Sequence, residues 1–312
     1  MDRISKDTLW KGIIEDLFED FCYYFFSSWA KQVADFSKKP EFLDKELQEI
    51  YPEAPSKKRY ADKLVKVFTQ QGTTQWVLVH IEVQGYKDAQ FAQRMFTYFY
   101  RILDRYKQKV MAIAIFTDAD KHYQPKEYFY EYEQTQSIYR FATFKLFHKT
   151  EEELTLKENP FSVVMLVAKK ALLKKNLADK AQLIWKRELV LKLKEANYSD
   201  GKIRKILNFI RFYVVFQEAN LLSELNQDIQ KTFKHRKNMG IEEAILQEVE
   251  EKGIEKGIEK GIEKGIEKGT LQTKTKAIKK ALQQQVLTVQ QIVDVFDVPT
   301  EFVLKVQREE LP

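Results

Sequence analysis

The stretch QWVLVHIEVQG, residues 75–85, decides the fold of the first half of the chain. It is rich in β-branched and aromatic residues and follows a turn at residues 72–74, so it predicts a β-strand. Residues 60–68, YADKLVKVF, have the same character, and the two segments together predict a β-hairpin. Because side chains alternate across a strand, Glu82 and Gln84 project from one face, roughly 6.6–6.8 Å apart.

The register of this hairpin decides what stands opposite Glu82. If the turn is centred on Gly72, Asp62 lies directly opposite Glu82 on the same face. Like charges placed in this way destabilise a sheet unless a cation compensates them, and two carboxylates that face one point suit Mg²⁺ or Mn²⁺. The alternative is a register shifted by two residues, with both carboxylates solvated at a sheet edge. The spacing alone favours that alternative slightly.

The elements around the hairpin indicate an α/β domain with a mixed sheet. Helical spacing predicts a long helix over residues 7–29 with Asp7 as its N-cap, a short helix over 42–50, and a helix over 88–106. The continuous apolar run of residues 110–117 predicts a buried strand.

An all-α region follows from about Pro160, where the strand pattern stops. Helical patterns cover residues 161–175, 180–196, 201–218 and 221–235. We expect residues 1–155 to form the α/β core and residues 160–238 to form a separate basic helical domain.

The tail contains an internal repeat, because Lys-Gly-Ile-Glu occurs four times in residues 252–269. A glycine at every fourth position costs a helix about 0.8–1.0 kcal/mol each relative to alanine. Residues 239–270 are therefore either a helix that packs on a partner through its glycines or a flexible tether. Residues 271–312 predict a small helical module, which is either a helix-turn-helix or an interaction module.

The charge of the chain is concentrated in one part. Residues 161–238 hold 17 Lys and Arg against 7 Asp and Glu, a net charge of +10 within a chain of +6. This excess indicates a polyanionic partner such as DNA, with Lys169, Lys170, Lys174 and Lys175 as candidate contacts. A solvated, lysine-rich helical surface explains the charge equally well.

Composition excludes several other classes. Hydrophobic residues make up 44% of the chain, which excludes a mostly disordered protein. No segment has the roughly 20 apolar residues needed to cross a bilayer, so we expect no membrane anchorage. The single cysteine, Cys22, and the lack of a signal-peptide pattern predict a cytoplasmic protein. The four histidines lack the paired spacing of a zinc site.

Asp62, followed about twenty residues later by Glu82-Val83-Gln84, resembles the PD-(D/E)XK nuclease pattern. Within that superfamily the chain is similar to the Rpn family of recombination-promoting nucleases and transposases. The similarity lies in five stretches and in the Lys-Gly-Ile-Glu tail. The stretches are DTLWK (7–11), FLDKEL (42–47), ADKLV (61–65), HIEVQG (80–85) and RMFTY (94–98). The resemblance covers residues 1–120 well and 160–270 loosely.

This resemblance implies a restriction-endonuclease-like core in residues 1–155 and a Mg²⁺- or Mn²⁺-dependent DNA endonuclease with a transposase-like role in recombination. Asp62 and Glu82 would hold the metal ion, with the Val83 carbonyl as a third ligand. Glu15 on the first helix would assist, and Glu46 is the rival candidate.

One position departs from the larger superfamily, which has lysine where this chain has Gln84. A glutamine can orient water or phosphate by hydrogen bonding, but it brings no positive charge. The Rpn branch shares this glutamine.

Two other functions remain open at the level of the sequence. The first is a nuclease fold that has lost activity and only binds DNA. The second is a helical scaffold that acts through its repeat tail. We expect the C-terminal helical region to aid self-association.

Overall fold

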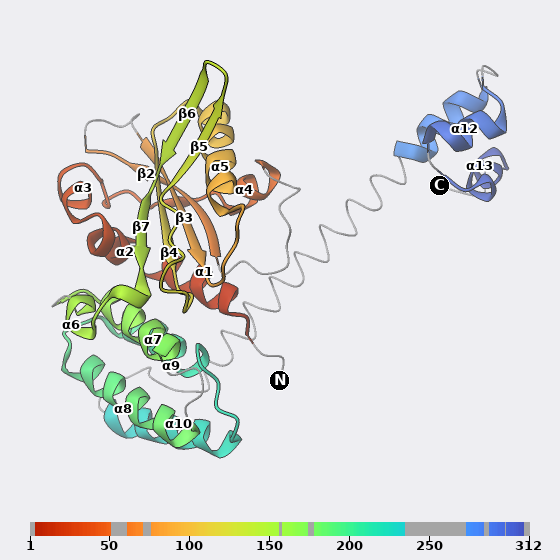
Figure 1. Cartoon of the computed structure of the whole chain (residues 1–312). Helices are drawn as coiled ribbons and strands as arrows, with labels where there is room; N and C mark the ends of the chain where they lie inside the picture. The colour runs from red at the N-terminus through yellow and green to blue at the C-terminus, as the bar shows by residue number, and fades with distance from the viewer. Residues whose placement is uncertain are drawn as a thin grey trace. The chain divides into compact units, whose positions relative to one another are not determined.

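A computed structural model gives the structure of the 312-residue chain. It describes residues 4–50, 61–70, 76–155, 158–173, 178–234, 273–283, 287–296 and 298–308 (Figure 1). The chain divides into two compact units, Met1–Ile241 and Glu242–Pro312. The Lys-Gly-Ile-Glu repeat, Lys174 and Lys175 lie outside the described residues.

The first unit is built on a five-stranded sheet with the order β1-β2-β3-β4-β7. Its strands are β1 (Glu41–Phe42), β2 (Ala61–Phe68), β3 (Trp76–Gln84), β4 (Val110–Phe116) and β7 (Ala142–Lys145). The pairs β1–β2 and β2–β3 are antiparallel, whereas β3–β4 and β4–β7 are parallel. The expected hairpin and mixed sheet are therefore confirmed.

Hydrophobic side chains on both faces of the sheet are covered by helices. On one face, here called the α5 face, Leu64 and Leu78 pack against Tyr98 and Ile102 of α5 (Phe91–Tyr106). The opposite side, here called the α1 face, carries the alternate residues of the same strands. Polar residues of β2 and β3 therefore lie in two different environments, one on the α5 face and one on the α1 face.

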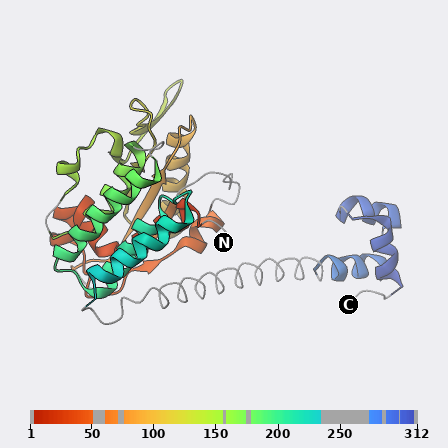
Figure 2. The same ribbon diagram turned by 90° about the horizontal axis from the view of Figure 1, so that it is seen from below.

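The α1 face packs on helices from both ends of the unit. Val65, Val79 and Ile81 share one core cluster with residues of α1 (Lys6–Asp16), α2 (Phe18–Phe25), α7 (Phe161–Leu173), α8 (Asp179–Glu195), α9 (Asp200–Phe212) and α10 (Ala219–Thr232). The helices α7–α10, drawn in green to cyan, lie side by side in both views (Figures 1 and 2). The change from strands to helices near residue 160 is therefore not a break in the core.

The expected long N-terminal helix is wrong, because the chain turns at Leu17 and again at Phe26 to form α1, α2 and the short α3 (Ser27–Gln32). A straight helix of 23 residues would be about 34 Å long, longer than the roughly 26 Å of β2. The turns keep the aromatic side chains over the sheet. Ser5, and not Asp7, caps α1, because its hydroxyl accepts a hydrogen bond from the Thr8 backbone N–H at 3.0 Å.

Several short elements were not expected. The strands β5 (Glu127–Tyr132) and β6 (Thr135–Arg140) form a separate hairpin beside α5 (Figure 1). Stacked ring pairs join this hairpin to α5, with centroid distances of 4.8 Å for Phe96–Tyr128 and 4.4 Å for Phe99–Tyr139. The short elements η1 (Leu146–His148) and α6 (Glu151–Leu154) were also not expected, whereas α4 (Asp44–Ile50) is the short helix predicted over residues 42–50.

The described part of the second unit is helical. Its described helices cover residues 273–283, α12 (Val289–Phe296) and α13 (Thr300–Gln307). Ile278, Ile292, Val303 and Val306 form its core, one or two from each helix. Throughout the described part of the chain, no helix combines the length and the apolar character that a membrane crossing requires.

Candidate functional site

The register of the hairpin places Asp62 directly opposite Glu82, as the turn at Gly72 predicts. The alternative register is therefore wrong. Glu82 is also not solvated, because only 1% of it is exposed. For Asp62 the structure describes the backbone position in β2 and not the side chain.

The polar residues of β3 lie on the α5 face in the centre of the sheet. His80, Glu82 and Gln84 alternate along β3, which has β2 on one side and β4 on the other. All three side chains are buried. A buried carboxylate requires a compensating charge, so the neighbours of Glu82 define the chemistry of the site.

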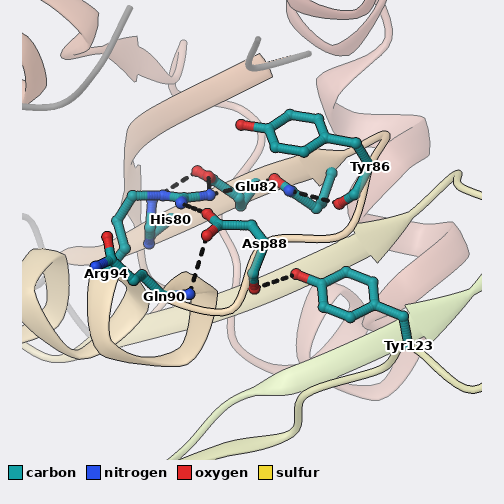
Figure 3. Close-up of polar contacts among 8 residues, drawn as sticks. His80, Glu82, Tyr86, Asp88, Gln90, Arg94 and Tyr123 are labelled. Carbon is teal, nitrogen blue, oxygen red and sulfur yellow. Dashed lines mark hydrogen bonds and ion pairs between the residues drawn. The ribbon is translucent and has the colours of Figure 1, made fainter.

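Arg94 supplies that charge from the first turn of α5. Its Nη2 donates hydrogen bonds to Oε1 of Glu82 at 2.9 Å and to Oε1 of Gln84 at 3.2 Å. Its Nη1 donates to Oδ2 of Asp88 (Figure 3). Burial by itself would lower the pKa of Arg94, but the carboxylates of Glu82 and Asp88 outweigh burial and raise that pKa above its ordinary value. Arg94 is therefore a permanent cation.

Asp88 is in turn anchored by the loop that joins β3 to α5. Its Oδ1 accepts a hydrogen bond from the Gln90 backbone N–H at 2.9 Å, and its carbonyl accepts one from the Tyr123 hydroxyl at 3.0 Å (Figure 3). Burial raises the pKa of Tyr123, so its hydroxyl stays protonated and able to donate. We call Glu82, Gln84, Asp88 and Arg94 the Arg94 network.

The amide of Gln84 is engaged at both ends. Its Oε1 accepts from Arg94, and its Nε2 donates to the Tyr86 carbonyl at 2.7 Å. The contacts fix which end of the amide faces Arg94. In this structure Gln84 holds Arg94, and its expected contact with water or phosphate stays a prediction.

Arg94 and Asp88 are the site residues that sequence reasoning missed. Arg94 lies in the RMFTY stretch, and it occupies the buried stripe of α5 together with Phe91, Met95, Tyr98 and Ile102. A charged residue on the apolar stripe of an amphipathic helix must find a buried partner. That conflict was the available signal.

The structure does not bring Glu15 to Glu82. Lys63 points to the α1 face, because it pairs in register with Ile81, and its Nζ donates to Oε2 of Glu15 at 3.0 Å and to Asp44. Asp44 is partly withdrawn from water, and burial raises its pKa above the ordinary value. Glu15 thus belongs to an ion-pair cluster on the other side of β2, and its rival Glu46 lies on α4.

Val83 lies between Ala61 of β2 and Ile115 of β4, so its carbonyl is part of the sheet. Its side chain is buried on the α1 face. The role of this carbonyl as a metal ligand stays a prediction.

By residue type, the two carboxylates of Asp62 and Glu82 suit a hard divalent cation, although the structure describes the side chain of Glu82 only. Among the described side chains, no three His, Cys, Asp or Glu residues cluster as a metal site. Mg²⁺ does not require such a cage, because it commonly binds through one or two carboxylates, with water and substrate phosphate completing its shell. Asp62, Glu82, Asp88 and Arg94 carry a formal charge of −2 together, which one divalent cation balances.

The expected DNA contact of Lys169 is wrong. Lys169 is 5% exposed, and its Nζ donates to the carbonyls of Leu146 at 3.2 Å and Phe147 at 2.8 Å. Lys170 pairs with Glu151 at 2.7 Å, and its side chain is largely buried. Both lysines therefore hold α7 to the preceding segment.

Much of the remaining positive charge of residues 161–238 is also used inside the unit. Ion pairs join Lys202 to Asp20 at 2.7 Å, Lys205 to Asp16 at 3.2 Å, and Arg187 to Glu224 at 2.5 Å and Asp228 at 2.6 Å. Three lysines of α8 remain exposed. They are Lys180, Lys192 and Lys194.

Asp62 opposite the buried Glu82, in a mixed sheet with helices on both faces, agrees with the core that the resemblance to the PD-(D/E)XK pattern implies. Residues 41–200, more than half of the chain, match the family described as "Putative transposase, YhgA-like". The chain therefore belongs to this transposase family, and the resemblance to the Rpn and PD-(D/E)XK type is confirmed. Neither a search of curated proteins nor a search of solved structures finds a match to the chain.

Proposed function

We propose that this member of the transposase family is a metal-dependent DNA endonuclease, which hydrolyses phosphodiester bonds and thereby promotes recombination. The observation that carries the proposal is the register that sets Asp62 opposite the buried Glu82. Family membership supports DNA as the substrate. Mg²⁺ or Mn²⁺ is the proposed cofactor, held by Asp62 and Glu82.

A divalent cation at this place would activate water and stabilise negative charge on the scissile phosphate. The residues of the chain prepare the place for it. Arg94 binds one carboxylate oxygen of Glu82 and so restricts the direction in which the carboxylate can point. Burial of Glu82 keeps bulk water away, which strengthens electrostatic interactions at the site.

A DNA-binding protein without cleavage is the second candidate, and one observation favours it. The charge of Glu82 is already compensated by Arg94, so the acidic pair does not depend on a metal ion to the extent that its spacing suggests. Under this alternative, a divalent metal ion does not change the stability of the protein, and the protein does not nick DNA with or without it.

Plasmid nicking separates the two candidates. The full chain is incubated with supercoiled plasmid in Mg²⁺, in Mn²⁺ and in EDTA. If the chain is the proposed nuclease, it nicks the plasmid in Mg²⁺ or Mn²⁺ and not in EDTA. Asp62→Asn and Glu82→Gln should abolish nicking while leaving DNA binding intact, because each removes a ligand charge and keeps the shape of the side chain.

The matched control is Asp104→Asn, which removes an exposed carboxylate from α5. This variant should nick as the parent does. Nicking by Asp62→Asn at the rate of the parent, or nicking by the parent in EDTA, would show that the proposed site is wrong.

A further inference from the structure

The guanidinium of Arg94 occupies a position between the end of β3 and the loop before α5. One nitrogen, Nη2, bridges the two residues that define the proposed motif, Glu82 and Gln84. The other, Nη1, is held by Asp88. Figure 3 shows the contacts of Arg94 with its carboxylate partners. Arg94 is 8% exposed, so these contacts are made away from solvent.

The chemistry at position 84 follows from this arrangement. A lysine there would place an ammonium group where Oε1 of Gln84 now accepts from Arg94 at 3.2 Å. Two buried cations at hydrogen-bonding distance repel each other strongly. Gln84 is therefore the complement of Arg94, and a positive charge is present at the site although position 84 has none.

We propose that Arg94 is a positioning residue of the site: it acts through Glu82 and Gln84 and supplies the fixed positive charge that Gln84 lacks. Asp88 holds Arg94 in place. The inference rests on the proposed nuclease function.

A purely structural role predicts something different. An arginine that only neutralises a buried carboxylate affects the folded population, and any replacement that restores the fold restores all other properties equally. A positioning role requires in addition that a positive charge lies beside Glu82 during the reaction. Exchanging the charge between positions 84 and 94 distinguishes the two roles.

The test is a double-mutant cycle of the full chain with Gln84→Lys, Arg94→Gln and the combined variant. Each single change should slow nicking at saturating Mg²⁺ by about a hundredfold, the size of the loss of one electrostatic contact in an active site. DNA affinity should stay within about threefold. The combined variant should nick within about tenfold of the parent, because one cation is again beside Glu82.

The matched control is Arg105→Gln, which removes an exposed arginine from the same helix and should change nothing. Arg94→Lys covers the case in which Arg94→Gln does not fold. It keeps the charge and loses the planar fork, so it should retain more nicking than Arg94→Gln. Equal losses in these two variants contradict the inference. Recovery of the melting temperature in the combined variant without recovery of nicking also overturns it.

Calorimetric titration with Mn²⁺ separates this inference from the proposed function. Mn²⁺ should bind most tightly to Arg94→Gln, with intermediate affinity to the parent and the combined variant, and most weakly to Gln84→Lys, with about a tenfold step for each added charge. If the four proteins bind Mn²⁺ in this order and the parent nicks no DNA, the nuclease proposal fails, and only the effect of Arg94 on metal binding stands. Equal Mn²⁺ affinities in all four proteins overturn the role of Arg94.

Discussion

Buried cations in the first unit have partners of two kinds. Arg94 is surrounded by the carboxylates of Glu82 and Asp88, which keep it charged. Lys186 of α8 is fully buried, and its Nζ donates to two backbone carbonyls instead, those of Arg211 at 3.0 Å and Val214 at 2.5 Å. Burial therefore lowers the pKa of Lys186 to about 7, although Asp179 nearby raises it in part.

This low pKa predicts a pH-dependent stability. The unfolded chain binds a proton at Lys186 up to its ordinary pKa of 10.5, whereas the folded chain loses it near pH 7. Between these values the unfolded state holds more protons, so the free energy of unfolding rises with pH by at most about 1.4 kcal/mol per unit. Urea titrations of the parent and Lys186→Met should therefore diverge in favour of the parent from pH 7 to 10.

The exposed Lys180 on the same helix provides the control, because Lys180→Met should run parallel to the parent at every pH. Parallel curves for the parent and Lys186→Met would show that the Lys186 pKa is not lowered.

At the scale of elements, one lysine joins α7 to the end of the sheet. Lys169 binds the carbonyls of Leu146 and Phe147 in η1, which directly follows β7. Without the Lys169 ammonium group, these two carbonyls would lose a hydrogen-bond donor in a buried region. Such a loss lowers the free energy of unfolding by roughly 1–3 kcal/mol.

Lys169→Met should therefore lower the free energy of unfolding by about 1–3 kcal/mol and leave DNA affinity unchanged. Chemical denaturation and fluorescence anisotropy with labelled DNA measure the two quantities. The exposed Lys192 serves as the comparison, because Lys192→Met should not change stability. Unchanged stability together with weaker DNA binding in Lys169→Met would restore its role as a phosphate contact.

At the scale of the whole molecule, the positive charge of residues 161–238 serves two purposes. Ion pairs with Asp16 and Asp20 bind α9 to α1 and α2, and they consume part of the excess. The exposed lysines of α8 remain available to a polyanion. Self-association through the Lys-Gly-Ile-Glu repeat stays a prediction, since the repeat lies outside the described residues.

DNA binding by the full chain should weaken steeply with salt, because bound lysines release counterions from the phosphates. Changing Lys180, Lys192 and Lys194 to Glu should weaken binding to all sequences and reduce the salt slope of the logarithmic plot. Anisotropy titrations between 50 and 200 mM salt measure both. An unchanged affinity and slope would exclude α8 from the DNA surface.

Local patterns were sufficient to predict the hairpin and the helices after residue 160. Each of these features depends on a period of 2 or 3.6 residues or on a turn between neighbouring segments. A short stretch of sequence is therefore enough to predict it. The register that sets Asp62 opposite Glu82 was one of two that the spacing allowed, and the structure decided between them. The two-residue β1 and four-residue β7 are too short to show a period, and they form because a longer strand offers them an edge.

The partners of the charged residues were decided by the tertiary structure. Lys63 meets Glu15 across 48 residues, and Lys169 meets Leu146 across 23. In the sequence alone, Arg94 was one residue of the RMFTY stretch, Gln84 stood where the larger superfamily has lysine, and Lys169 was part of a basic segment. Charges interact through space, and only the packing of α5 and α7 on the sheet determines which opposite charges and carbonyls they reach.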